Sequence, residues 1–346
     1  MWRVLAAACA AGPLLVSACA GGAAVPVPAP AAVVYYRDPA DPSLAIVAGW
    51  DGKVRGRLPL PAGATSWQQS PDGAYLLVPT GAGDTSRVMS PEGRVVLTVA
   101  SGATWADDSR HLCVIADVSG RFPGGVVTAT GPNTTSTGFP PAHVFIDSVD
   151  GASRRVATAP RFSPVSDSRA YCSIRRDRVV VVSSSLGLAQ VAGVLDLSNG
   201  HRLRFDAAGS AMVAVSPDAA YIAESNQSGT ATTVRDVATG RVVGRVGEGQ
   251  VRAISASGRL AVRQHPGTVG PPASLSASPS VDVVELASGR ILWVANGSLA
   301  DLVVEPDGSR FLVGARPAGT DLEDVWLVHA DGTAAGLARR VRPATG

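Results

Sequence analysis

A chain of 346 residues whose formal net charge is only +2 at pH 7 offers no strongly basic or acidic surface. We therefore expect no nucleic-acid partner and no acidic substrate. Charged residues make up 17% of the chain, whereas Gly (38) and Pro (25) are abundant, as in proteins built from many short strands and turns. No helical apolar period of useful length is visible, so the sequence favours an all-β body.

The first eighteen residues differ from the rest of the chain. One cation, Arg3, precedes an almost wholly apolar or small run over positions 4–16 that is too short for a comfortable membrane span. This pattern predicts a cleaved signal peptide over residues 1–18. The ending Val16-Ser17-Ala18-Cys19 resembles the lipobox of bacterial lipoproteins, which implies that Cys19 is diacylated and becomes the new N-terminus. The alternatives are lipidation at Cys9 and an ordinary signal peptide with a secreted, soluble product.

Residues 19–32 have no periodicity and contain much Pro, Gly and Ala. Such a stretch buries little and predicts a flexible tether after the lipidated Cys19. We expect residues 33–346 to form one domain, exported and held at the outer face of the cell membrane.

One small unit recurs through this domain, a pair of β-branched strands joined by a tight turn that ends in Gly. The turn Gly supplies the positive φ that a hairpin demands, and the runs on both sides supply the strands. Seven copies occur, at Gly52, Gly93, Gly151, Gly200, Gly240, Gly289 and Gly332. Since an isolated hairpin cannot bury its apolar face, the copies are expected to pack together.

A second hairpin alternates with the first, and its turn reads Ser-Pro-Asp-Gly or a relative of it. The six turns lie at 70–73, 106–109, 163–168, 216–219, 255–258 and 305–308. Two hairpins recurring at intervals near 40 residues are the signature of a four-stranded propeller blade. The pattern predicts a β-propeller with six complete blades, numbered one to six along the chain. The leftover hairpin over 44–60 closes the ring with a strand over 33–36, as an incomplete seventh blade; six blades in total is the alternative.

The turns at 70–73 and 305–308 and the segments 236–240 and 285–289 resemble the WD-repeat-like and TolB-type propellers of bacteria, with some likeness to the YVTN group. The resemblance spans residues 33 to about 337. It departs from eukaryotic WD repeats, because no Trp-Asp dipeptide ends each blade and no Gly-His opens it. Members of such families mostly bind proteins or carbohydrates, and a minority are enzymes.

Two cysteines, Cys113 and Cys172, remain in the domain. Both follow an Asp-Ser-Arg turn, so they align at equivalent positions of blades two and three. Packed sheets lie about 10 Å apart, which exceeds the separation of about 7 Å that a disulfide tolerates. Two buried thiols are therefore expected, unless the strand at 179–182 shifts the register of blade three.

Long links between second and third strands are expected in blade two (119–142), blade three (175–190) and blade five (264–280). Antiparallel strands bring these links to the face opposite the tight turns, and such loops commonly bind partners. The candidate binding residues on this long-loop face are Phe122, Asn133, Phe139, His143 and His265.

Catalytic and metal-binding patterns are scarce. The five histidines have no metal-ligand spacing, and no nucleophile elbow, phosphate loop or haem motif occurs. We expect no cofactor, no metal and a monomer that binds an unidentified protein or glycan of the cell envelope without catalysis. The alternative is a propeller enzyme of the lyase, lactonase or quinoprotein type, with its site at the channel mouth.

The anchor is testable at one residue. Cys19→Ala removes the thiol that accepts the lipid, so metabolic labelling with a palmitate analogue should fall to background. The double variant Cys9→Ala/Cys19→Ala identifies any label that has moved to Cys9. Undiminished label in the double variant would contradict the assignment.

Overall fold

Short β-strands and turns make up the described part of the chain. A computed structural model describes residues 33–38, 40–41, 43–64, 66–80, 85–116, 143–156, 168–185, 188–203, 212–226, 230–265, 278–305, 307–320 and 323–341. The predicted leader, Cys19 and the tether lie outside these residues. Among the residues described, no helix is long and apolar enough to cross a membrane.

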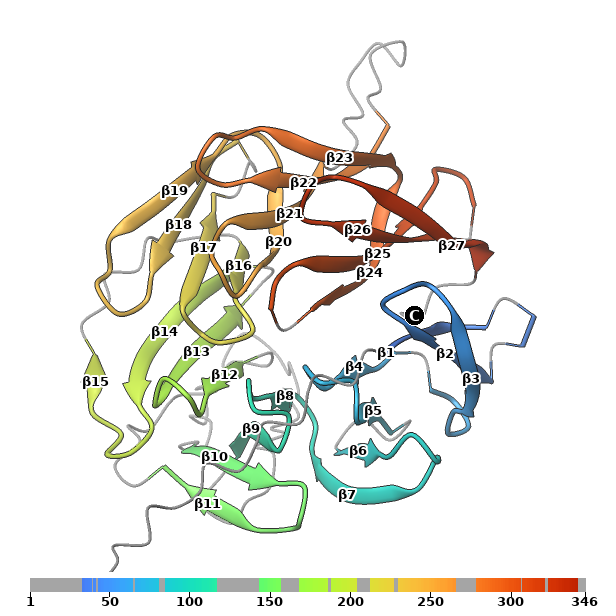
Figure 1. The fold of residues 1–346 in the computed structure, drawn as a ribbon. Coiled ribbons are helices and arrows are strands. Elements are labelled where there is room, and N and C mark those ends of the chain that lie inside the picture. The colour runs from blue at the N-terminus through green and yellow to red at the C-terminus, as the bar shows by residue number, and fades with distance from the viewer. Residues whose placement is uncertain are drawn as a thin grey trace, which may run out of the picture.

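Seven small antiparallel sheets stand around a common axis, so the domain is a seven-bladed β-propeller (Figure 1). Six sheets have four strands and one has three, as the sequence predicted. The three-stranded sheet is the seventh blade, and it contains β1 (Val33–Arg37), β2 (Leu44–Gly49) and β3 (Val54–Pro59).

The other six sheets follow in chain order, and the strands of each sheet are given from the axis outwards. Blade one contains β4 (Gln68–Gln69), β5 (Leu76–Pro79), β6 (Thr85–Met89) and β7 (Val95–Ala100), and blade two contains β8 (Thr104–Trp105), β9 (His111–Ala116), β10 (His143–Ser148) and β11 (Ser153–Arg155). Blade three contains β12 (Arg169–Ser173), β13 (Arg178–Ser185), β14 (Leu188–Asp196) and β15 (Arg202–Leu203), and blade four contains β16 (Met212–Val215), β17 (Tyr221–Ser225), β18 (Thr232–Asp236) and β19 (Val242–Val246). Blade five contains β20 (Gln250–Ile254), β21 (Leu260–His265), β22 (Ser280–Glu285) and β23 (Ile291–Asn296), and blade six contains β24 (Ser298–Val304), β25 (Arg310–Arg316), β26 (Glu323–His329) and β27 (Ala334–Val341).

Turn glycines set the hairpins as predicted. The seven repeat glycines all have φ between +69° and +92°, and each lies between the last two strands of its blade. The turns between the first two strands also pass through positive φ, at Gly73, Ser109, Asp177, Ala219, Gly258 and Gly308. Both kinds of turn leave one face of the ring, the tight-turn face, because the strands are antiparallel.

The third blade differs from the prediction. Its first turn lies at 174–177 rather than at 163–168, and its second and third strands are separated only by residues 186–187. The reason is the β-branched run that begins at Arg178, which forms the second strand instead of part of a long link. Long links between second and third strands therefore remain in blades two and five, after Ala116 and after His265.

Apolar side chains are buried between blades rather than within them. The buried apolar residues of the described chain form seven clusters, and each cluster joins side chains of two neighbouring blades. Two of these clusters flank the seventh blade. One packs Tyr36 and Val34 against Leu312 and Leu327 of blade six, and the other packs Tyr35 and neighbouring residues against blade one.

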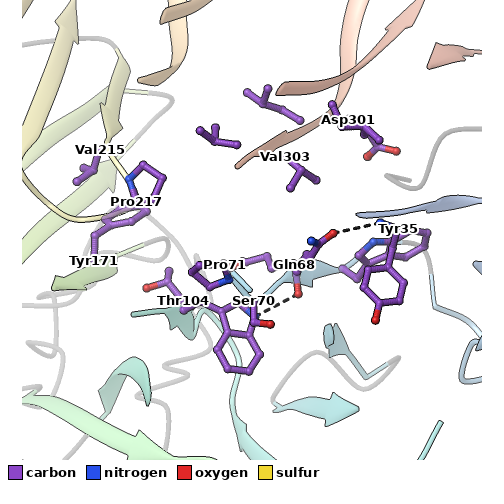
Figure 2. Close-up of a pocket in the computed structure, with 16 residues that line it drawn as sticks. Tyr35, Gln68, Ser70, Pro71, Thr104, Tyr171, Val215, Pro217, Asp301 and Val303 are labelled. Carbon is purple, nitrogen blue, oxygen red and sulfur yellow. Dashed lines mark hydrogen bonds between the residues drawn. The ribbon is translucent and has the colours of Figure 1, made fainter. Parts of the chain in front are cut away.

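Polar contacts also close the ring at the seventh blade, and Figure 2 shows the hydrogen bond that Tyr35 makes there. The Tyr35 amide donates to Oε1 of Gln69 (3.1 Å), and Nε2 of Gln69 donates to the Val33 carbonyl (2.8 Å). On the opposite junction, Nη1 of Arg310 donates to the Trp50 carbonyl (3.1 Å), and its guanidinium lies 5.5 Å from the centre of the Trp50 ring. Blades six and one are thus both joined to the incomplete blade.

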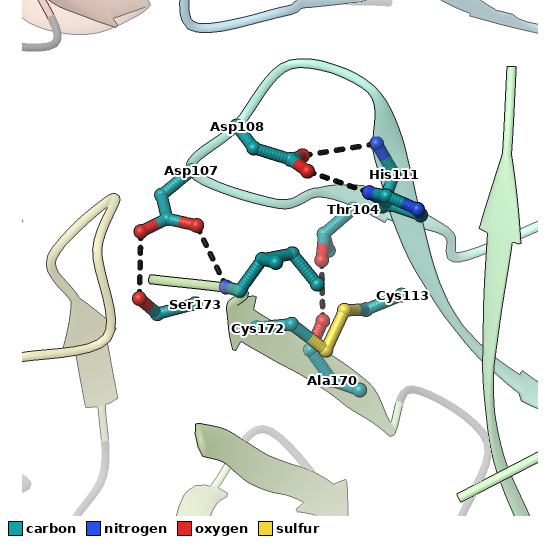
Figure 3. The surroundings of a disulfide bond; sticks show 9 residues. Thr104, Asp107, Asp108, His111, Cys113, Ala170, Cys172 and Ser173 are labelled. Carbon is teal, nitrogen blue, oxygen red and sulfur yellow. Dashed lines mark hydrogen bonds and ion pairs between the residues drawn. A yellow bond between two sulfur atoms is a disulfide. The ribbon is translucent and has the colours of Figure 1, made fainter. Parts of the chain in front are cut away.

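A disulfide joins Cys113 and Cys172, which contradicts the expected buried thiols (Figure 3). Cys113 lies on β9, the second strand of blade two, but Cys172 lies on β12, the innermost strand of blade three. The shifted register of blade three means that the two positions are not equivalent. Their Cα atoms are 6.0 Å apart, which a disulfide accommodates.

The disulfide should stabilise the ring measurably. It closes a loop with a sequence separation of 59, so its removal in Cys113→Ala/Cys172→Ala should lower the free energy of unfolding by about 2–4 kcal/mol in urea titrations. The variant should show no further loss under reducing conditions, whereas the parent should. Titration of two free thiols at Cys113 and Cys172 in unreduced, denatured parent protein would contradict the pairing.

Candidate functional site

The axis of the ring contains a pocket of about 290 Å³ (Figure 2). Its wall comes from every blade except the fifth, because the innermost strands converge on the axis. The lining residues are Tyr35, Trp67, Gln68, Gln69, Ser70, Pro71, Thr104, Trp105, Tyr171, Val215, Pro217, Asp301, Leu302, Val303, Val304 and Leu312.

The aromatic side chains of this wall are held in place. Nε1 of Trp105 donates to the Gln68 carbonyl (3.2 Å), and its ring stacks on Tyr75 with centroids 6.0 Å apart. The Tyr35 hydroxyl donates to the Gly73 carbonyl (2.9 Å), and burial, with the nearby Asp72 and Glu92, raises the pKa of Tyr35 to about 12. The phenol therefore stays neutral at physiological pH. These rings form a fixed wall with uncharged hydrogen-bonding groups beside it.

Trp67 lines the pocket at its long-loop end, and Arg37 packs against it there. The guanidinium of Arg37 lies 5.3 Å from the centre of the Trp67 ring, and its Nη2 donates to the Ala64 carbonyl (3.1 Å). Burial lowers the pKa of Arg37, and nearby Asp301 and Glu323 partly oppose this.

A carboxyl pair, Asp301 and Glu323, lies at the junction of blades six and seven. Asp301 on β24 lines the pocket, whereas Glu323 at the start of β26 is only 1% exposed. Burial and the adjacent Asp301 raise the pKa of Glu323 to about 9, while Arg316 and Arg37 oppose the shift. At neutral pH Glu323 is therefore protonated and shares its proton with Asp301 in a hydrogen bond.

Gly314 on β25 makes room for this pair. It lies opposite Asp301 in the sheet, and a Cβ added at Gly314 would stand 2.6 Å from Oε1 of Glu323 and 3.0 Å from Cβ of Asp301. Any larger residue would push the carboxyl groups away. The pair thus requires glycine at position 314 because a side chain there would occupy the space of the carboxyl groups, and not because of the backbone conformation.

A second hollow, of about 310 Å³, opens at the tight-turn end of the axis and shares Pro71 and Pro217 with the first. Three of its charged groups, Asp107, Arg176 and Asp218, make contacts between blades. Asp107 accepts from Oγ of Ser173 (2.6 Å) and from the Ile174 amide (2.7 Å), and Arg176 pairs with Asp218 (2.7 Å) (Figure 3 shows the Asp107 contacts). These residues hold neighbouring blades together, so the axial pocket is the stronger candidate site.

The structure describes only two of the predicted site residues, His143 and His265. Phe122, Asn133, Phe139 and Cys19 lie outside the described residues. His143 is buried at the start of β10, and His265 ends β21, so both lie at the long-loop face as expected. They belong to blades two and five, which are not neighbours, so the structure does not bring them together.

His265 belongs to a local ion-pair network. Its Nε2 lies 3.0 Å from Oδ2 of Asp282, and Arg263 bonds the same carboxylate through two nitrogens (2.9 and 2.6 Å). All three residues lie on the adjacent strands β21 and β22. This network explains His265 as part of the blade's own structure.

Sequence reasoning missed Gln69, Asp301 and Glu323. A signal existed for Asp301, because it stands inside an otherwise apolar strand. No sequence signal existed for Glu323, because only the folded sheet brings its strand, β26, close to Asp301 on β24. Among the described residues, no group of three His, Cys, Asp or Glu side chains is arranged to hold a metal ion. The axial pocket offers apolar surface and hydrogen-bonding groups, and a carboxyl pair with one shared proton lies beside it.

Comparison with known proteins adds little beyond general shape. No protein-family model and no curated protein matches the chain. One similar solved structure is hydrazine synthase of Kuenenia stuttgartiensis, with 17% identity and a TM-score of 0.48 over 78% of this chain and 77% of that one. Another is TolB of Acinetobacter baumannii, with 12% identity and a TM-score of 0.46 over 90% of this chain and 64% of that one. The β-propeller domain of Cps50 (Swd1) from Myceliophteria thermophila is also similar, with 8% identity and a TM-score of 0.48 over 82% of this chain and 90% of that one. The assignment of the fold rests on the seven sheets rather than on these matches.

The buried proton of Glu323 should make stability depend on pH. The unfolded chain releases this proton near the ordinary glutamate pKa, whereas the folded protein retains it up to about pH 9. Between these values the free energy of unfolding should fall as pH rises, by up to about 1.4 kcal/mol per pH unit from this group. Glu323→Gln copies the protonated form, so in urea titrations it should lose that part of the decline.

The exposed Glu92→Gln is the matched control and should keep the decline of the parent. Equal pH dependence in the Glu323→Gln variant and in the parent would show that Glu323 is already ionised in the folded state.

Proposed function

We propose that this chain is a non-catalytic binding module whose site is the axial pocket together with the long-loop face around it. The composition of the pocket wall carries the proposal. Fixed aromatic rings, amides and hydroxyls line it, with Asp301 as the one charged group among the lining residues. Walls of this kind bind by burial and hydrogen bonding, and they lack the converging acid, base or metal groups of a catalytic site.

The surroundings of the pocket support binding at its long-loop end. Trp67 and Arg37 reach this end, where the chain enters β4 and leaves β1. The long links after Ala116 and after His265 leave the same face, because the strands of each blade are antiparallel. Loops gathered on one face of a closed scaffold supply contacts to a partner without disturbing the scaffold.

We propose the cell envelope as the place of action. The N-terminal pattern supports export and a lipid on Cys19 at the outer face of the cell membrane, with residues 19–32 as the tether. The partner is then a protein or a glycan of the envelope, bound by a monomer.

A second candidate function is catalysis at the same pocket, as in a propeller lyase or lactonase. The Asp301–Glu323 pair favours it, because carboxyl groups with strongly raised pKa values are common among catalytic acids. However, Glu323 is almost wholly buried and only Asp301 lines the pocket. Binding therefore explains more of the site.

Shortening the long loops tests the proposal. The full-length chain is used to recover partners from envelope extracts, with identification by mass spectrometry. Replacing residues 120–141, or 266–279, by a short Gly-Ser link should leave the melting temperature almost unchanged, since loop-closure entropy changes slowly with length. Recovery of the partner should fall at least about tenfold if the loops contribute about 1.4 kcal/mol or more.

Asp331→Asn, in a tight turn on the opposite face, is the control and should retain full recovery. Two shortened proteins that remain folded and keep full binding would place the binding surface elsewhere.

A further inference from the structure

The seventh blade leaves a strand edge facing the axial pocket. In the six complete blades an innermost strand pairs with the axial edge of the second strand, but the described part of the seventh sheet ends at β1. The pocket lies beside this edge, because Tyr35 of β1, Gln69 of β4 and Val303 of β24 all line it. Part of the pocket therefore lies between the innermost strands of blades six and one, where an innermost strand of the seventh blade would pair with β1.

A side-chain amide serves this edge in the way that a peptide group would. Oε1 of Gln69 accepts from the Tyr35 amide (3.1 Å), and Nε2 of Gln69 donates to the Val33 carbonyl (2.8 Å). Val33 and Tyr35 are alternate residues of β1, and alternate residues direct their main-chain groups to the same edge. A peptide strand offers the same donor and acceptor, and one side chain can rotate away to admit it.

The chemistry of the surrounding wall limits what such a segment can be. Val303 and Leu312 present apolar surface on the side of blade six. Asp301 is the one charged lining residue, and its carboxylate is already hydrogen-bonded to Glu323. A short segment is enough, since β4 and β8 are innermost strands of two residues each. An extended, uncharged stretch with an apolar residue toward Val303 meets these conditions.

We propose that a short, extended and uncharged segment of a partner polypeptide adds to β1 as the innermost strand of the seventh blade and displaces the amide of Gln69. It runs antiparallel to β1, as the six other innermost strands run to their neighbours. Main-chain hydrogen bonds then provide affinity, and the side-chain pocket provides selectivity. The inference rests on the proposed binding function, because it identifies the partner as a polypeptide rather than a glycan.

A synthetic peptide tests the inference directly. The probe is the uncharged heptapeptide Ser-Ala-Met-Val-Ala-Val-Ser, the sequence of residues 210–216, which includes the innermost strand β16. Added to the full-length chain, it should shift the amide NMR signal of Tyr35 and slow its hydrogen exchange. Gln69→Ala removes the competing amide, so the peptide should bind about tenfold more tightly, the effect of roughly one or two hydrogen bonds.

The matched control is Asn199→Ala. Asn199 lies in a tight turn of blade three and lines neither pocket, and its amide hydrogen-bonds to Asp196 (3.2 Å) and to the His201 amide (2.7 Å), so this variant should bind like the parent. A peptide N-methylated at its central valine and at the alanine after it should lose binding, because one of the two blocked N–H groups faces the edge of β1 in either register. An unaffected Tyr35 amide, equal binding of the N-methylated peptide, or equal effects of Gln69→Ala and Asn199→Ala would overturn the inference.

Three further outcomes separate this inference from related ideas. If the peptide binds only after truncation behind Val341, the chain's own C-terminal residues fill the position, and the partner segment is refuted. A chain that recovers its envelope partner but does not bind the peptide overturns the inference and leaves the proposed function intact. A chain that binds the peptide at β1 but recovers no partner contradicts the proposed function alone.

Discussion

Burial of apolar side chains between neighbouring blades is the interaction on which the rest of the structure depends. Each of the seven clusters belongs to two sheets, so no blade has a core of its own. A fully buried Leu or Val stabilises by about 1.5–3 kcal/mol, and this gain requires both sheets of a pair to be in place. Closure of the ring is therefore a condition for all of the junctions rather than a detail of the last one.

The three-stranded blade meets this condition and creates the site. Its clusters with blade six and blade one are complete, so the ring closes with β1 to β3 alone. Near the axis, however, β4 and β24 stand on either side of the pocket, and Gln69 satisfies main-chain groups of β1 that a strand would otherwise satisfy. An incomplete blade thus provides both a fixed wall and an accessible strand edge at one position.

At the junction of blades six and seven, the Asp301–Glu323 pair balances the cost of burying carboxyl groups against a hydrogen bond between them. Burying a carboxyl group costs free energy, and here the group avoids part of that cost by remaining protonated and bonded to Asp301. Gly314 leaves the space that both side chains occupy.

Local turn chemistry is what the sequence alone determined. The repeat glycines, the Asp-containing turns and the β-branched runs predicted seven blades with one incomplete, because positive φ and strand preference depend on a few adjacent residues. The sequence also assigned His143 and His265 to the correct face, since strand direction follows from the order of hairpins.

Only the tertiary structure decided which residues meet. The run after Arg178 shifted the register of blade three, and that shift brought Cys172 beside Cys113. The ring also brought Gln69 to β1 and Glu323 to Asp301. These contacts cross between blades or between strands that are distant in the sequence, and they are set by how sheets pack around an axis. Local periodicity carries no information about that packing, which is why the fold was readable from the sequence and the site was not.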